Sequence, residues 1–392
     1  MDMNMKKINV LKPKFRTKEI LSEIEECLDR GWTGMGYKTE LFEEAWKNYT
    51  NLPNAHFISS NTVGLHLALN IFKKKYNWED GDEVITTPLT FISTNHAIKY
   101  ENLTPVFADV DEYLCIDIDD FKKKITPKTK ALIYVGIGGN CGDLQSIKYI
   151  CEKHNIKLIL DAAHMAGTSI NINHHGVALT NEHIGQHADV TVFSFQAVKN
   201  LPTADSGMIC FKDSEDDKKA RKLTWLGIDK DTFSRSSKGS YKWKYNVDEL
   251  GFKYHGNSIM ASIGLVQLKY LEEDNERRRE IADLYDKHLK DLNGIKIVET
   301  NKWVYKSSRH LYQIRIINKD RDLVMDKLYN QNIFPGVHYI DNTNYDLYNE
   351  YKGTCPKAEQ YSKELITLPI HLDISNEDIT YITNNLKSII NE

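Results

Sequence analysis

Hydrophobic and polar positions follow two alternating periods through the first half of the chain. Short apolar runs typical of buried strands are separated by stretches in which apolar residues recur every three or four positions, as in amphipathic helices. The clearest helical stretches are Thr62–Lys74 and Asp143–His154. The predicted strands are Ala55–Ser59, Glu83–Thr87, Thr104–Val110, Lys130–Ile137, Lys157–Asp161, Asp189–Phe195 and Met208–Lys212.

This alternation predicts an α/β fold with a mostly parallel central sheet that is flanked by helices on both faces. One segment, Asp213–Asn246, interrupts the pattern. It is highly charged and carries large aromatic residues, among them Trp225, Tyr241 and Trp243. We therefore interpret it as a long excursion from the fold, either functional or mobile.

The pattern changes again in the last third of the chain. A helical run begins near Asn257, His310–Ile317 alternates like a strand, and Arg321–Asn332 is helical in pattern. We therefore predict a large α/β domain over residues 15–250 and a smaller C-terminal α+β domain over residues 251–392. Residues 1–14 are expected to pack with the smaller domain.

Composition narrows the class of protein. The chain has 392 residues, 27% of them charged, and a net charge of -4, which argues against a nucleic-acid binder. No apolar run approaches the roughly 20 residues that cross a bilayer, and the N-terminus lacks a secretory signal. The six cysteines are isolated in the sequence, so we expect reduced thiols in a cytoplasmic protein without a membrane anchor.

Three polar motifs stand at predicted strand ends, where a parallel sheet gathers its ligands. Ser59–Gly64 leads directly into a helix, whose free N–H groups favour an anion; an ordinary helix cap is the alternative. Asp161 ends one strand, and a carboxylate there can bind a ribose hydroxyl, a metal or a protonated ring nitrogen. The alternative is that it only caps its own loop. Lys199 follows another strand in an apolar context, where desolvation lowers the pKa of an amine and makes it a nucleophile.

Two further patterns are weaker. The Gly136–Gly142 loop lies between a strand and a helix and imitates a dinucleotide-binding turn, but its third glycine is one position late. An NAD-dependent oxidoreductase is therefore the second hypothesis. His183 and His187 have the i, i+4 spacing of some metal sites, yet Gly185 and the polar surroundings favour a solvated loop. We predict no metal.

Several motifs occur in an order that resembles a known family. These are Gly31–Gly36, Ser59–Thr62, Thr87–Asn95, Asp161–His164, Ser194–Asn200, Ala261–Leu268, Val337–Tyr339 and Leu368–His371. Together they resemble the DegT/DnrJ/EryC1/StrS family of pyridoxal-phosphate-dependent sugar aminotransferases, which have fold type I. The resemblance covers nearly the whole chain.

The resemblance implies a role for each matching position. Lys199 would bond to pyridoxal 5'-phosphate and move the substrate proton, and Asp161 would keep the ring nitrogen protonated. Phe91 would stack on the ring, and His164 would lie near its phenolic oxygen. The other implied cofactor-binding residues are Ser60, Asn61, Thr62, Val63, Ser194, Gln196 and Lys253. The implied substrate-binding residues are His338, Tyr339 and Trp243.

The chain departs from the family pattern at four places. Asn61 replaces a usual Gly in the phosphate loop, and Gly136 replaces a common His. Lys253 replaces an Asn that reaches the cofactor phosphate of the partner subunit. The loop Asn171–Gln186 is longer than usual. Lys199 is retained, which disfavours the family's dehydratases, because these carry His at that position.

The implied reaction moves an amino group from L-glutamate to a keto sugar, with pyridoxamine phosphate as the intermediate form of the cofactor. The expected acceptor is a nucleotide-linked 4-keto-6-deoxy or 3-keto hexose used for lipopolysaccharide, capsule or another glycan. Cyclitols and small ketone phosphates stay open as acceptors. A homodimer with shared active sites is expected. A non-catalytic binding protein on the same fold is disfavoured by Lys199.

Overall fold

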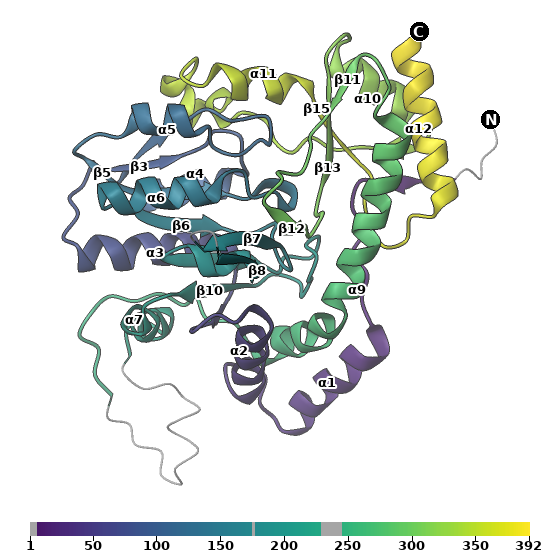
Figure 1. Cartoon of the computed structure of the whole chain (residues 1–392). Helices are drawn as coiled ribbons and strands as arrows, with labels where there is room; N and C mark the ends of the chain where they lie inside the picture. Colours follow the sequence, from purple (N-terminus) through teal and green to yellow (C-terminus); the bar gives the residue numbers. More distant parts are fainter. Residues whose placement is uncertain (1–5, 175–176, 229–244) are drawn as a thin grey trace.

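The structure is a computed structural model that describes residues 6–174, 177–228 and 245–392 (Figure 1). Its centre is a seven-stranded sheet. The strands are, in spatial order, β2 (His56–Ile58), β10 (Gly207–Phe211), β9 (Val190–Ser194), β6 (Lys157–Asp161), β5 (Thr129–Val135), β3 (Glu83–Thr86) and β4 (Thr104–Phe107). The predicted mostly parallel sheet is confirmed. Within this sheet only β10 runs against its neighbours, since it pairs antiparallel with both β2 and β9.

Each strand of the sheet supplies side chains to two hydrophobic cores, because successive residues of a strand point to opposite faces. In β6, Leu158 and Leu160 join one core while Ile159 joins the other. The first core is covered by α2 (Tyr37–Thr50), α5 (Ile118–Lys124) and α6 (Leu144–His154). The second is covered by α3 (Asn61–Lys75), α4 (Ile92–Tyr100) and α7 (Ser214–Thr224).

Helix α7 corrects the prediction that Asp213–Asn246 is one long excursion. The helix begins after Asp213, whose carboxylate accepts a hydrogen bond from the Glu215 N–H, and it buries Ala220 and Leu223. The apolar residues are few, so the surrounding charges conceal the helical period. Residues 229–244, which include the predicted substrate-binding residue Trp243, lie outside the described residues.

A third hydrophobic core, the C-terminal cluster, is built mostly from the last third of the chain. Helix α9 (Ser258–Leu289) joins it to the first core, since Ala261 and Leu271 pack in the first core while Ile281 and Leu289 pack in the C-terminal cluster. The other elements that pack in this cluster are β1 (Ile8–Asn9), β11 (Ile295–Ile297), β13 (Tyr312–Ile316), α10 (Arg321–Tyr329), β14 (Ile333–Phe334), β15 (Leu365–Leu368) and α12 (Asn376–Asn391). Strand β1 pairs with β14, and Ile8 packs in this cluster. Helix α11 (Pro356–Glu364) instead packs through Ala358 in a smaller cluster with Leu89 and Phe107.

The segment Asn171–Gln186 belongs to a hairpin rather than to a loop. Strands β7 (Ser169–His174) and β8 (Val177–His183) pair with each other, and β12 (Val304–Lys306) adds a third strand. The prediction that His183 and His187 lie in a solvated loop is wrong. His187 is only 7% exposed, and its Nε2 lies 3.4 Å from the Glu182 carboxylate.

The remaining α-helix of the described residues, α1 (Thr17–Asp29), packs beside α9 (Figure 1).

Candidate active site

One cavity of about 460 Å³ opens at the carboxyl ends of β5, β6 and β9, the edge at which parallel sheets bind ligands. The lining residues that the sequence predicted are Ser60, Asn61, Thr62, Phe91, Asp161, His164, Ser194, Gln196, Lys199, His338 and Tyr339. The lining residues without a predicted role are Thr90, Ser93, Val135, Gly136, Ala163, Val198 and Asp205. The structure therefore brings together strand-end motifs that are far apart in the sequence.

Lys199 is held in this cavity by a tight turn after β9. Its backbone N–H donates to the Gln196 carbonyl at 2.9 Å, and the Gln196 side-chain oxygen accepts from the Val198 N–H at 2.9 Å. Burial of the amine lowers the pKa of Lys199 to about 8, although the Asp161 charge opposes this effect. An amine with this pKa is partly neutral near physiological pH, so it can act as a nucleophile or a base.

Asp161 ends β6 and is 4% exposed. One carboxylate oxygen accepts from the Thr94 hydroxyl at 2.8 Å, and the other accepts from the Ala163 N–H at 3.2 Å. Burial raises the pKa of Asp161, while these hydrogen bonds and the Lys199 charge oppose the rise. Thr94 has no role in the sequence prediction, although it lies inside the motif Thr87–Asn95. Its only sequence signal is its place one turn after Thr90.

The N-terminus of α3 forms the third wall of the cavity. Ser60 caps the helix and accepts a hydrogen bond from the Val63 N–H at 3.3 Å. A Cβ atom at Gly207, on the neighbouring strand, would lie 2.9 Å from the Asn61 nitrogen, so glycine is needed for the close approach of β10 to this turn. The hydroxyls of Ser60 and Thr62 and the helix N-terminus form a set of groups that suits a phosphate.

The glycine loop after β5 packs against protein and holds His164. A Cβ at Gly139 would lie 2.4 Å from the Ser308 hydroxyl, so no cleft for a pyrophosphate opens there. The Gly138 N–H donates to His164 Nδ1 at 3.2 Å. The proposed dinucleotide-binding role of Gly136–Gly142 is therefore wrong. The missing His at Gly136 also has a reason, because a Cβ there would lie 1.9 Å from the Met165 sulfur.

These contacts fix the orientation of His164. Because a backbone N–H can only donate, Nδ1 of His164 must be the unprotonated nitrogen. Burial keeps the pKa of His164 well below its ordinary value, so Nε2 carries the single ring proton. It faces the Tyr339 hydroxyl at 3.0 Å, which leaves the hydroxyl proton of Tyr339 free to point into the cavity.

Three predicted residues of the described part of the chain lie at the margin of the site or outside it. Val63 does not line the cavity, and its N–H donates to the Ser60 hydroxyl. Phe91 lines the cavity, but its side chain is 57% exposed. Lys253 does not line this cavity in the single chain; its amine lies 3.2 Å from the centre of the Trp225 ring. A contact of Lys253 with the cofactor phosphate of a partner subunit stays a prediction.

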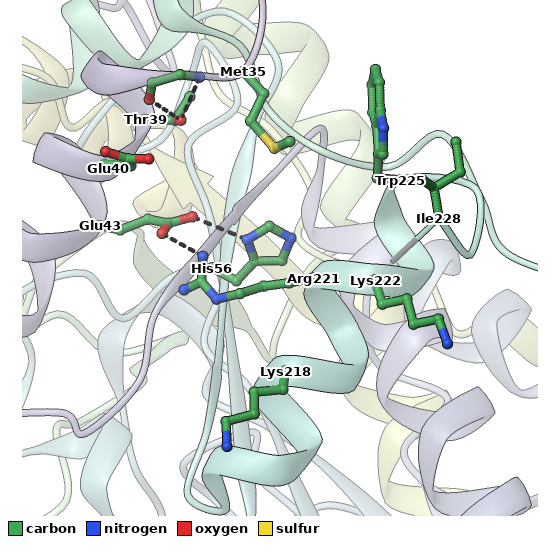
Figure 2. Close-up of a pocket in the computed structure, with 11 residues that line it drawn as sticks. Met35, Thr39, Glu40, Glu43, His56, Lys218, Arg221, Lys222, Trp225 and Ile228 are labelled. Atoms are coloured by element: carbon green, nitrogen blue, oxygen red, sulfur yellow. Dashed lines mark hydrogen bonds and ion pairs between the residues drawn. The ribbon is translucent and has the colours of Figure 1, made fainter. Parts of the chain in front are cut away.

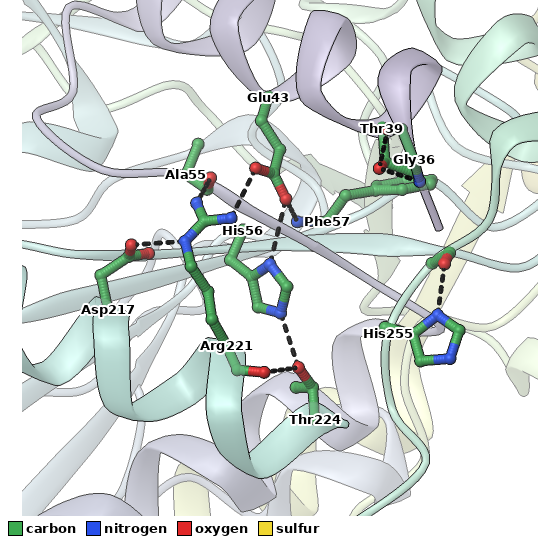
Figure 3. Close-up of polar contacts among 11 residues, drawn as sticks. Gly36, Thr39, Glu43, Ala55, His56, Phe57, Asp217, Arg221, Thr224 and His255 are labelled. Atoms are coloured by element: carbon green, nitrogen blue, oxygen red, sulfur yellow. Dashed lines mark hydrogen bonds and ion pairs between the residues drawn. The ribbon is translucent and has the colours of Figure 1, made fainter. Parts of the chain in front are cut away.

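A second, smaller cavity lies between α2 and α7 (Figure 2). The Glu43 carboxylate accepts from Arg221 at 2.7 Å and from His56 Nδ1 at 3.0 Å (Figure 3). His56 Nε2 lies 2.8 Å from the Thr224 hydroxyl. The order Thr, His and Glu imitates a nucleophile triad, but Thr224 is fully buried and its hydroxyl donates to the Arg221 carbonyl. We interpret this network as structural.

The described residues contain neither a membrane-spanning helix nor a metal-binding group of three or more His, Cys, Asp or Glu residues. The mostly parallel sheet, the strand-end Asp161 and the Lys199 amine in one cavity are features of a fold-type I pyridoxal-phosphate enzyme. The model of the DegT/DnrJ/EryC1/StrS aminotransferase family matches residues 15–387 of the chain. The chain belongs to this family, and a transaminase activity follows from that membership.

Curated relatives agree over almost the whole length. The chain is 33% identical to the spore coat polysaccharide biosynthesis protein SpsC of Bacillus subtilis, over 95% of each chain. It is 29% identical to the dTDP-4-dehydro-2,3,6-trideoxy-D-glucose 4-aminotransferase of Saccharopolyspora spinosa, over 98% of this chain and 97% of that protein. Both relatives support the assignment to sugar aminotransferases.

A protein with a similar fold was solved in two cofactor forms. Spr1654 from Streptococcus pneumoniae has a TM-score of 0.88 and 28% identity, covers 98% of this chain and 99% of its own, and was solved in a PLP-form. A PMP-form of the same protein gives the same TM-score and identity. The family uses pyridoxal phosphate, and the groups present here fit it: an amine, a carboxylate, and hydroxyls at a helix N-terminus.

Proposed function

We propose that this protein transfers an amino group from L-glutamate to the keto group of a nucleotide-linked hexose, with pyridoxal 5'-phosphate as its cofactor. The acceptor is a 4-keto-6-deoxy or 3-keto sugar, and the product serves surface-glycan biosynthesis. The observation that carries the proposal is the meeting of Lys199 and Asp161 in one cavity beside the N-terminus of α3. An amine with a lowered pKa and a strand-end carboxylate meet the needs of this chemistry.

Bound pyridoxal phosphate would supply an electron sink for the bonds at the amino-bearing carbon. The chain's own groups would do the remaining work. The Asp161 carboxylate would face the ring nitrogen, while Ser60, Thr62 and Ser194 would hold the phosphate. The Lys199 amine, which is partly neutral because burial lowers its pKa to about 8, would take the substrate proton and return it at the acceptor carbon.

Two names among the relatives support a sugar acceptor. The S. spinosa enzyme acts on a dTDP-linked 4-dehydro sugar, and SpsC takes part in polysaccharide biosynthesis. The cavity adds polar groups that suit a hydroxylated substrate, since the Tyr339 hydroxyl proton is free to donate and His338 lines the same wall. A neutral donor of this kind favours an oxygen-rich sugar over an apolar ketone.

We also propose a homodimer in which each subunit completes the site of its partner. Phe91 at the cavity mouth is 57% exposed, and Leu250, three residues before Lys253, is 84% exposed in the single chain. Large exposed apolar side chains such as these are typical of a subunit interface. Lys253 would then approach the cofactor phosphate of the partner subunit, as the family pattern implies. Analytical ultracentrifugation of the loaded protein tests the dimer.

The experiment for the function uses the absorption of the bound cofactor. Purified protein is loaded with pyridoxal phosphate and then mixed with L-glutamate, with L-aspartate and L-alanine as alternative donors. The protein-bound band above 400 nm, a range expected for a cofactor bonded to a lysine, should bleach with glutamate and be altered in Lys199→Ala. A panel of keto sugars, with and without a nucleotide, should then restore the band. Absence of a band in the wild-type protein would refute the proposal.

A further inference from the structure

Asn61, the residue that departs from the family pattern, does not turn its side chain toward the phosphate site. It is 7% exposed, and its amide nitrogen donates to Asp161 Oδ1 at 3.2 Å and to the Val192 carbonyl at 3.0 Å. Val192 on β9 is the register partner of Asp161 on β6. The Asn61 side chain therefore connects the first turn of α3 to the ends of two neighbouring strands.

The chemistry of these partners fixes which end of the amide faces them. A carbonyl and an ionised carboxylate can only accept, so the group between them must be the NH₂ of Asn61 with its two hydrogens. Turning the amide by half a rotation would set its oxygen against two other oxygens. The orientation of Asn61 is thus determined by its neighbours.

The hydrogen bonds of Asp161 then distinguish its two oxygens. Within the described part of the chain, Oδ1 accepts from Asn61 and from the Ala163 N–H, whereas Oδ2 accepts from Thr94 alone. Each carboxylate oxygen has about two acceptor positions. Oδ1 is saturated, and Oδ2 keeps one position open. The open position belongs to a buried carboxylate on the wall of the cavity.

We propose that Asn61 is a positioning residue, which occupies Oδ1 of Asp161 and so directs the open position of Oδ2 to the ring nitrogen of the cofactor. This inference rests on the proposed function, because it needs pyridoxal phosphate in the cavity. A glycine at position 61 has no such donor. With glycine there, Oδ1 would keep an open acceptor position, and only Thr94 and the Ala163 N–H would hold the orientation of the carboxylate.

The test compares two cofactors that differ only at the ring nitrogen. Dissociation constants are measured by absorption titration for pyridoxal phosphate and for deazapyridoxal phosphate, in which a C–H replaces the nitrogen. The variants are Asn61→Ala and Asn61→Gly, the second being compatible with the family's own pattern. Asn70→Ala is the matched control, since Asn70 lies on the same helix and donates to Glu101 instead.

Both Asn61 variants should bind pyridoxal phosphate about tenfold more weakly, the effect of one hydrogen bond to a charged group. Their affinity for the deaza compound should match that of the wild type, and Asn70→Ala should match for both. An equal loss for both cofactors would show that Asn61 only shapes the cavity. No loss for either would show that Asp161 is held without Asn61. A wild-type protein that binds neither compound would overturn the proposed function together with this inference.

Discussion

The cavity around Lys199 and the network around Glu43 both place charged groups inside the protein, but they differ in how those groups are satisfied. Glu43 accepts from Arg221, from His56 and from the Phe57 N–H, so its charge is neutralised by protein. In the larger cavity the Lys199 amine forms no hydrogen bond or ion pair with another described residue, and Asp161 keeps an acceptor position open. A buried charged group whose hydrogen-bond positions are all filled by protein indicates a structural role. A buried charged group with an open position indicates a reactive site.

The largest effect should follow from removing the Lys199 amine. Lys199→Ala should reduce transamination at least about a thousandfold, because proton transfer by a positioned group is lost. The unfolding midpoint should not fall, since the substitution removes a partly buried charge. Turnover with glutamate and a keto sugar, with thermal unfolding measured in parallel, checks this. Substantial residual turnover would place the proton transfer on another group.

Breaking the Glu43 network should instead affect stability. Glu43→Gln leaves Arg221 without a charged partner on α2 and should cost about 3 kcal/mol of unfolding free energy. Glu40→Gln is the control, because Glu40 lines the same smaller cavity but is exposed. Urea unfolding measures both variants. Equal stability of Glu43→Gln and the control would contradict the structural interpretation of the network.

The pH dependence of this effect has a defined sign. Burial opposes ionisation of Glu43, but His56 and Arg221 outweigh it and lower the pKa of Glu43. The contribution of Glu43 should therefore be complete above the unfolded pKa of roughly 4.3. It should disappear as the pH falls through the lower folded pKa. A gap between wild type and Glu43→Gln that stays constant down to pH 3 would contradict this prediction.

Packing at the wall of the larger cavity should have a smaller effect. Gly136→Ala introduces a Cβ 1.9 Å from the Met165 sulfur and should cost about 2 kcal/mol through overpacking. The double variant Gly136→Ala/Met165→Ala should lose less than the sum of the two single losses. Gly34→Ala is the control, because no atom lies within 4 Å of its Cβ position. Additive losses would show that the two residues do not compete for space.

The smallest predicted effect concerns the contribution of the buried Lys199 amine to stability. Burial lowers the pKa of Lys199 to about 8, so the unfolded chain binds more protons between pH 8 and about 10.4. Lys199→Met should stabilise the cofactor-free protein at pH 7 by about 1 kcal/mol, because solvent in the cavity screens part of the cost. The gain should shrink as the pH rises above 8. The exposed Lys218→Met provides the control.

The fold was predictable because its signals are local. Apolar runs and helical periods located the strands and helices to within a few residues, as Thr62–Lys74 shows against α3 (Asn61–Lys75). Helix α7 was missed because only a few of its residues, among them Ala220 and Leu223, face the core. The reversed direction of β10 was also missed, since a strand's sequence does not record which way its neighbour runs.

Sequence alone determined the fold class and pointed to Lys199 and Asp161 as candidate site residues, since each lies in a local motif at a strand end. Tertiary structure alone decided how those groups are connected. It directs the Asn61 side chain toward Asp161 and packs other side chains against the Gly136–Gly142 loop. It also places the ring proton of His164 on Nε2. These outcomes depend on distances between segments that lie far apart in the sequence, by 100 residues for Asn61 and Asp161 and by 175 for His164 and Tyr339. No local pattern of residue types specifies such distances, because they arise only when the sheet brings its strand ends to a common edge.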